Sequence, residues 1–304
     1  MTIIVGVEAG EAALAAVRYA ATEATRTGEP LELVHAAPEL GPLGAAAARM
    51  QPVTDSAHRA LGERTLNHAR RAAREITGDH WRIRTHVLAG PAARALVAAS
   101  DDARVVVIGH RHRSPLEHLL VGSVLGRLAG RLTLPVVVVP ESWVPGDLHG
   151  LVVLGVDEDD DAEALLRVAL ATAGDRSARL GVVHAWDLPD QYDDRLTLPP
   201  DGDVWPTAPI GTLDAALRRA RPEHPHVPVD LELTHGRAGD VLCRAAERAD
   251  LLIVGIRHRA LTAAGLGRTV HAVLHDAPCP VALVPVRSAA AVRGARPALD
   301  PELV

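Results

Sequence analysis

Residues 3–20 read IIVGVEAGEAALAAVRYA, and residues 152–169 read VVLGVDEDDDAEALLRVA. Both stretches begin with an apolar run, pass through a glycine, a valine and an acidic residue, and then take up the apolar spacing of a helix. The matching residues keep one constant separation of 149 positions: Gly6 with Gly155, Glu8 with Asp157, Arg18 with Arg167, and His35 with His184. The chain therefore carries the same strand-and-helix opening twice.

The later parts of the two copies match at slightly smaller separations. The separation is 146 positions for Gly90 with Gly236, Gly109 with Gly255 and Arg111 with Arg257, and 145 positions for Pro135 with Pro280. A separation that changes only in small steps is what a duplication followed by short deletions leaves behind. We therefore expect a first domain over residues 1–140, a linker over 141–150, a second domain over 151–287 and a flexible tail over 288–304.

Each copy alternates short Val/Ile/Leu runs with helical patterns. Runs of this kind are typical of strands that are covered on both faces, as in a parallel sheet between two layers of helices. We predict an α/β fold of two repeated domains, each with a five-stranded parallel sheet and helices on both faces. In the first copy the pattern predicts a helix over Glu11–Arg26, a loop over 38–53 and a helix over Asp55–Ile76 that opens with a Thr/Asp capping signal.

The same reading places a strand over Val105–Gly109 and a helix over Ser123–Leu132 in the first copy. In the second copy it places strands near residues 151–156, 180–184, 228–234, 251–254 and 281–284. A Pro- and Asp-rich loop, whose role the sequence does not indicate, spans about residues 187–210.

Composition restricts the class of protein. The chain has 304 residues, a net charge of −6 and no extended basic stripe, which argues against a nucleic-acid partner. No apolar run approaches the roughly 20 residues that span a bilayer, so we expect no membrane association. The two cysteines show no ligand spacing, which favours a reducing cytoplasm over a disulfide scaffold or a zinc site.

The candidate functional residues follow the strands. Ligands of open parallel sheets bind beyond the carboxyl ends of the strands, where the strand order reverses. In the first copy that edge receives Glu8, Val34 and the loop that starts at Gly109, which we expect to turn the chain sharply out of its strand. Farther along this loop, Gly122 and Ser123 open a helix, whose free amides attract anions, and Arg111 adds positive charge. The alternative is that Gly109 only ends a strand, Ser123 only caps a helix and the arginine is solvated.

These residues resemble those of the universal stress protein family, and the two-copy layout resembles its tandem members, which have an adenine-nucleotide alpha-hydrolase-like fold. The features that carry the resemblance are the openings IIVGVEAG and LVVLGVDED, the strand ends LVHA and VVHA, and the endings LPVVVVP and CPVALVPV. ATP-binding members have a loop Gly-x2-Gly-x9-Gly-Ser/Thr after the fourth strand and an Asp after the first. The resemblance implies nucleotide contacts from Glu8, Val34, Gly109, Arg111, His112, Gly122, Ser123 and Val124 in the first copy, and from Asp157, Val183, Gly255, His258, Gly267, Arg268 and Thr269 in the second.

Both loops depart from the family pattern at its middle glycine, which is His112 in the first copy and His258 in the second. A histidine there would either donate to a phosphate or fill the space that the phosphate needs. The first copy keeps the spacing and the Gly-Ser pair but has Glu8 for Asp, whereas the second keeps Asp157 and has Arg268 in the Ser/Thr place. We therefore expect a nucleotide to occupy the two copies unequally, with the first copy the better site.

The resemblance implies a stress-response regulatory protein that binds ATP or a related adenine nucleotide, with Mg²⁺ accompanying ATP. The alternative is an interaction scaffold of the same fold that binds no nucleotide. We expect no dedicated enzyme, because the chain has no His-x-Gly-His, Ser-Gly-Gly-x-Asp-Ser or Walker sequence; slow ATP hydrolysis stays open. We also expect no metal site of the protein's own, because His110-x-His112 lacks a third ligand.

The resemblance implies partners within and beyond the chain. The last strands, residues 136–139 and 281–284, would pair across the two copies, because apolar edge strands are otherwise an aggregation hazard. Further association into a homodimer and binding of a regulatory protein of unknown identity belong to the same expectation.

Overall fold

The computed structural model describes residues 1–38, 44–111, 124–128, 130–131, 133–146, 148–157, 161–187, 207–257 and 266–286. The side chains of residues 44–55, 207–210 and 257 are not described. The predicted tail (288–304) and most of the predicted 187–210 loop lie outside these ranges. The last residues of that loop are helical.

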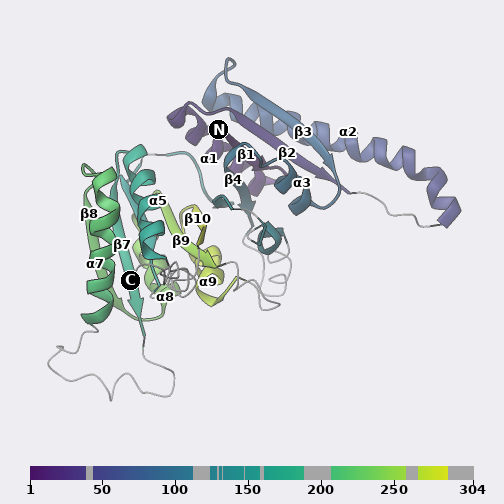
Figure 1. Cartoon of the computed structure of the whole chain (residues 1–304). Coiled ribbons are helices and arrows are strands. Elements are labelled where there is room, and N and C mark those ends of the chain that lie inside the picture. The colour runs from purple at the N-terminus through teal and green to yellow at the C-terminus, as the bar shows by residue number, and fades with distance from the viewer. Residues whose placement is uncertain are drawn as a thin grey trace, which may run out of the picture.

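Within the described residues, both halves alternate strands and helices (Figure 1). The first half contains β1 (Thr2–Gly6), α1 (Glu11–Thr27), β2 (Leu31–Ala37), α2 (Gly44–Thr77), β3 (Ile83–Ala89), α3 (Ala92–Ala98), β4 (Ala103–His110), a helical segment over 124–128, and β5 (Val136–Pro140). The second half contains β6 (Leu151–Gly155), α5 (Ala162–Asp175), β7 (Arg179–Trp186), α7 (Thr207–Ala220), β8 (Val229–His235), α8 (Ala238–Ala245), β9 (Leu251–Arg257), α9 (Arg268–Asp276) and β10 (Val281–Val286), with short 3₁₀ turns after α7 and α8.

The ten strands form one continuous sheet in the order β3-β2-β1-β4-β5-β10-β9-β6-β7-β8. All neighbours within each half run parallel, which confirms the expected fold class, and the two halves join where β5 meets β10 antiparallel. At this seam Val138 faces Val281 and Val136 faces Leu283. Because the direction reverses there, the carboxyl ends of the strands of the two halves lie at opposite edges of the sheet.

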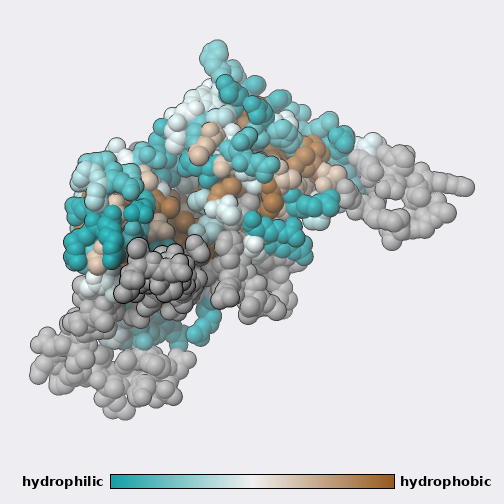
Figure 2. Space-filling model, viewed as in Figure 1, coloured by the Kyte–Doolittle hydropathy of each residue, from teal (hydrophilic) through white to brown (hydrophobic). Residues whose placement is uncertain are grey.

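Strand side chains are buried on both faces. Ile3 and Val5 belong to a core shared with α1, α2, α5 and α7, whereas Ile4 and Val34 belong to a second core under α3, α8, α9 and residues 124–128. Hydrophilic residues make up most of the coloured surface in Figure 2, and hydrophobic residues show in patches among them. Among the described residues, no helix is long and apolar enough to cross a membrane.

The predicted first residue of α2, Asp55, was wrong. The helix begins at Gly44, so residues 44–53, which we expected to be a loop, are helical, and the Thr/Asp capping signal lies inside the helix. The run GAAAAR is rich in alanine, the strongest helix former, which outweighs the signals of the Pro and Gly residues around it. The N-terminal part of α2 projects away from the rest of the first half (Figure 1).

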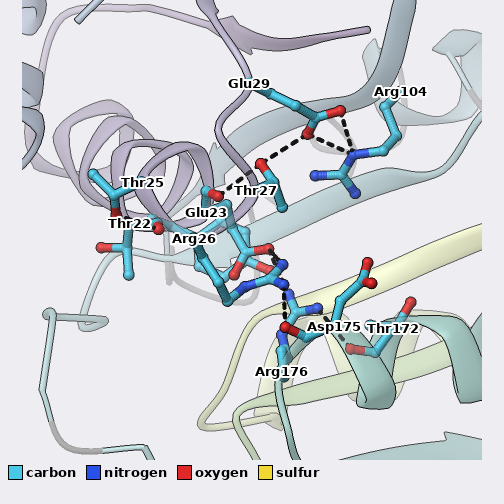
Figure 3. A network of polar contacts seen from close by, with 11 residues as sticks. Thr22, Glu23, Thr25, Arg26, Thr27, Glu29, Arg104, Thr172, Asp175 and Arg176 are labelled. Carbon is cyan, nitrogen blue, oxygen red and sulfur yellow. Dashed lines mark hydrogen bonds and ion pairs between the residues drawn. The ribbon is translucent and has the colours of Figure 1, made fainter.

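A partly buried ion network connects the two halves beside the seam (Figure 3). Arg176, at the end of α5, donates to Glu23 Oε2 at 2.8 Å and to the Tyr19 hydroxyl at 3.1 Å, both on α1. Arg26 donates to the same Glu23 oxygen and, at 2.8 Å, to the carbonyl of Asp175. Burial raises the pKa of Tyr19 well above its usual range, so its hydroxyl stays neutral and accepts from Arg176.

The ring of Trp143 lies edge-on to Tyr19, with the two ring centroids 5.4 Å apart. Residue 143 belongs to the segment between β5 and β6, so this contact attaches that segment to α1.

Arg176→Ala should lower the free energy of unfolding by about 1 to 3 kcal/mol, because it leaves a partly buried carboxylate and a buried phenol with fewer donors. Urea unfolding followed by circular dichroism measures this change. Arg179→Ala is the control, since Arg179 is half exposed and pairs with the exposed Asp230, and it should cost no more than about 1 kcal/mol. Equal losses for the two variants would show that the network adds nothing to stability.

Candidate functional site

The described residues of the first half enclose a pocket of about 310 Å³ at the carboxyl edge of the sheet. This volume is at the lower end of the range for small-molecule sites. The pocket lies where the strand order reverses, between β1 and β4, which is where the fold class places its ligands. It is lined by Gly6, Val7, Glu8, Ala12, Ala13, Val34, Ala36, Ala92, Leu96, Ile108, Gly109, His110, Arg111, Val124, Leu125 and Val138.

Small side chains make the hollow, and the polar groups lie at strand and helix ends. Alanines and glycines supply six of the lining positions, and larger aliphatic side chains, among them one each from β2, α3, β4 and β5, supply most of the rest. The polar lining residues are Glu8, after β1, and His110 and Arg111, at the end of β4. The pocket thus combines apolar walls with one acid and two nitrogen donors.

A glycine is required at position 109 because the backbone of β4 passes close to that of α1 there. The sequence predicts a different reason, a sharp turn out of the strand. Gly109 lies within β4, one residue before the strand ends, so the explanation by a turn was wrong. A Cβ at this position would lie 2.0 Å from the carbonyl oxygen of Ala12, in the first turn of α1. Only glycine lets β4 and α1 come this close, and their contact forms the wall of the pocket between Ala12 and Gly109.

Arg111 lies across the loop between β1 and α1. Its guanidinium donates to the carbonyl oxygen of Ala9 and covers Gly10, where any side chain would collide with it. Gly10 also has a φ of 121°, a conformation that favours glycine. The loop conformation therefore places a cation beside the start of α1, at the mouth of the pocket.

A histidine at the end of the second strand fixes the exit of the first strand in both halves. Nδ1 of His35 lies 2.8 Å from the carbonyl oxygen of Val7, and Nδ1 of His184 lies 3.0 Å from that of Val156. A carbonyl only accepts, so Nδ1 carries the proton in each ring. These bonds hold the backbone just before Glu8 and Asp157, which explains why the sequence repeats this histidine.

The structure brings five of the predicted first-half residues together in the pocket: Glu8, Val34, Gly109, Arg111 and Val124. His112, Gly122 and Ser123 lie outside the described residues. The sequence pattern did not indicate the contributions of α1 and α3, above all Ala12, Ala13, Ala92 and Leu96, because small or aliphatic residues there are typical of an ordinary core. The missed His110 and Val138 had a signal, since one follows Gly109 directly and the other lies in the predicted last strand.

In the second half, Asp157 follows β6, Val183 lies near the end of β7 and Gly255 lies near the end of β9. Gly267 is the N-cap of α9 with a φ of 84°, and Arg268 and Thr269 form the first turn of that helix. The predicted glycine at a helix start is thus present in this half. His258 lies outside the described residues.

The potential metal ligands and the thiols of the described residues are scattered or protonated. Within the described part of the chain, no three His, Cys, Asp or Glu side chains gather closely enough to hold a metal ion. Burial raises the pKa of Cys243 to about 11 and that of Cys279 to about 12, so both are protonated at neutral pH.

Comparison with known proteins identifies a family model and relatives that match nearly the whole chain. The model of the universal stress protein family matches residues 1–140 and 151–285. A universal stress protein of Mycobacterium tuberculosis is 28% identical over 291 residues, which is 92% of this chain and 95% of that protein. One of Mycolicibacterium smegmatis is 29% identical over 294 residues, which is 93% and 96% of the two chains.

A solved structure shares the whole architecture. The crystal structure of a universal stress protein from Archaeoglobus fulgidus has a TM-score of 0.71 to this chain at 15% identity, covering 94% of this chain and 96% of that one. At this identity the likeness supports the fold, including its two-domain layout.

Gly109→Ala should lower the free energy of unfolding by about 1 to 3 kcal/mol, because the new methyl group forces α1 away from β4. Gly211→Ala in α7 is the control, since a Cβ there meets nothing within 4 Å, and it should be neutral or stabilising by up to about 1 kcal/mol. Thermal and urea unfolding measure both variants. An unchanged Gly109→Ala protein would contradict the close approach.

Both thiols should react slowly with a thiolate-specific reagent at pH 8 in the native protein, because the raised pKa values leave little thiolate. The rate for Cys243 should rise with pH up to about pH 11, and both thiols should react fully in denaturant. Rapid native labelling at pH 8 would contradict the raised pKa values of the two thiols.

Proposed function

The chain belongs to the universal stress protein family, and we propose that it is a stress-response regulatory protein that binds an adenine nucleotide in the pocket of its first half. The observation that carries this proposal is the pocket between the carboxyl ends of β1 and β4. Its walls are apolar enough for a purine ring, and its mouth holds the Arg111 guanidinium for a phosphate.

The proposed contacts in the first half are Glu8, Val34, Gly109, Arg111 and Val124, together with His112, Gly122 and Ser123 on the sequence pattern alone. Val34 is buried in the pocket wall, and its apolar side chain suits the base. When the ligand is ATP, Mg²⁺ would accompany it, and Glu8 is the one carboxylate among the described lining residues. The equivalent residues of the second half are Asp157, Val183, Gly255, His258, Gly267, Arg268 and Thr269, and the first half is the better site in this proposal.

The proposed output is a change in assembly or in binding to a regulatory protein, and not turnover of the nucleotide. The described lining residues include no Ser, Thr or Cys that would act as a nucleophile. His110 and Glu8 are the described groups able to move a proton, which leaves slow hydrolysis as the most that this arrangement supports.

A scaffold without a nucleotide is the competing function, favoured by the histidines in the glycine places of both loops. The two functions differ in whether the protein retains and responds to nucleotide. Protein purified without added nucleotide should release ATP, ADP or AMP on denaturation, as measured by mass spectrometry. Clean protein with no thermal shift in millimolar ATP would favour the scaffold.

Ala36→Met should weaken ATP binding at least about tenfold, because the longer side chain enters the pocket without adding charge. Ala185→Met is the matched control, since it makes the same change at the equivalent residue of β7 and should leave the affinity of the first half unchanged. Isothermal titration calorimetry of both variants tests the location of the site. Equal affinities for the two variants would place the nucleotide elsewhere.

A further inference from the structure

The two halves differ in charge where the chain leaves its first strand. In the second half, six of the seven residues over 157–163 are acidic, whereas the equivalent residues 8–14 of the first half include only Glu8 and Glu11. The framework around these segments is otherwise repeated. The exit of the second half is therefore far more negative than that of the first.

The helices that follow align position by position. The buried residues of α1 recur on α5 at the separation of 149 positions: Ala16 with Leu165, Val17 with Leu166, Ala20 with Ala169, Ala21 with Leu170, and Ala24 with Ala173. The histidine bonds to Val7 and Val156 keep the same separation. This alignment places Asp161 at the position of Ala12.

Ala12 and Asp161 occupy equivalent positions, but the first turns of α1 and α5 are capped differently. In α1, the N-cap is Gly10, which supplies no side-chain cap, and Ala12 and Ala13 line the pocket. In α5, the N-cap is Asp161, whose Oδ1 accepts the amide of Ala164 at 3.2 Å. A carboxylate thus lies over the first turn of α5 and uses the positive end of that helix, where the first half presents a methyl group to its ligand pocket.

Nearby arginines act on a different acid. Arg167 pairs with Glu163 at 2.9 Å, and Arg219 pairs with the same carboxylate at 3.6 Å. Their charges offset that of Glu163, while Asp161, within the described part of the chain, has a neutral backbone amide as its partner. An anionic ligand at this edge would meet a fixed like charge at short range.

We propose that Asp161 is a specificity-determining residue that excludes anionic ligands from the second half, so that the chain binds one nucleotide, in its first half. This inference rests on the proposed function and explains how a faithful duplication gives unequal sites. The two sheet edges face opposite ways, so a ligand in one half has no direct contact with the other site.

Calorimetric titration of the full chain with ATP tests the inference through the number of sites. The unmodified chain should bind one ATP. Asp161→Asn keeps an oxygen to cap the helix and removes the charge, so it should create a second site, at least about tenfold tighter than any second-site binding of the unmodified chain. A variant that fails to fold would lose binding, so a gain of binding in Asp161→Asn is not explained by misfolding.

Two further variants locate the new site. Asp230→Asn removes a carboxylate from the start of β8, at the opposite edge of the second half, and should leave one site. The double variant Ala36→Met/Asp161→Asn should keep one site, now in the second half.

Two sites in the unmodified chain, or one site in Asp161→Asn, would overturn the role of Asp161 and leave nucleotide binding intact. No binding by the unmodified chain would instead overturn the proposed function.

Discussion

The pairing of β5 with β10 is the contact on which the architecture depends. Every residue of β5 is buried, and β10 is nearly as buried, so each strand needs an apolar neighbour on its free side. Antiparallel pairing gives that neighbour and turns two five-stranded sheets into one of ten strands. The ion network of Glu23, Arg26 and Arg176 lies beside this seam and adds polar contacts that a purely apolar joint would lack.

Close backbone approach then shapes the ligand edge. The contact of Gly109 with Ala12 brings α1 against β4, and the small residues around it leave room for a pocket between strands that diverge at the switch point. In the second half the same framework receives Asp161 at the start of its helix. The repeat keeps its strands and several glycines but differs at the start of this helix, where the N-cap is Gly10 in α1 and Asp161 in α5.

Periodicity and punctuation residues predicted much of this structure. The repeated strands, the helices on both faces and the edge that holds the pocket follow from alternating patterns and from the fixed separations of Gly6, Gly109 and His35 from their copies. The start of α2 did not follow, because an alanine run competes with nearby loop signals. Ala12, Ala92 and Leu96 were invisible as pocket residues because their side chains carry no chemistry; only their placement makes the hollow. The role of Gly109 was misjudged because a sequence does not show what packs against a strand.

The segment between β5 and β6 gives the seam a property that two separate chains would not have. Its ten residues connect the halves covalently, and Trp143 attaches it to Tyr19. A short connection holds its ends at an effective concentration in the millimolar range, so the paired state does not dissociate when the protein becomes scarce. Each half can also change without forcing the same change on its neighbour, which a symmetric pair of identical chains does not allow. The covalent connection therefore makes the pairing of the two halves independent of protein concentration. It also allows the surfaces of the two halves to evolve separately.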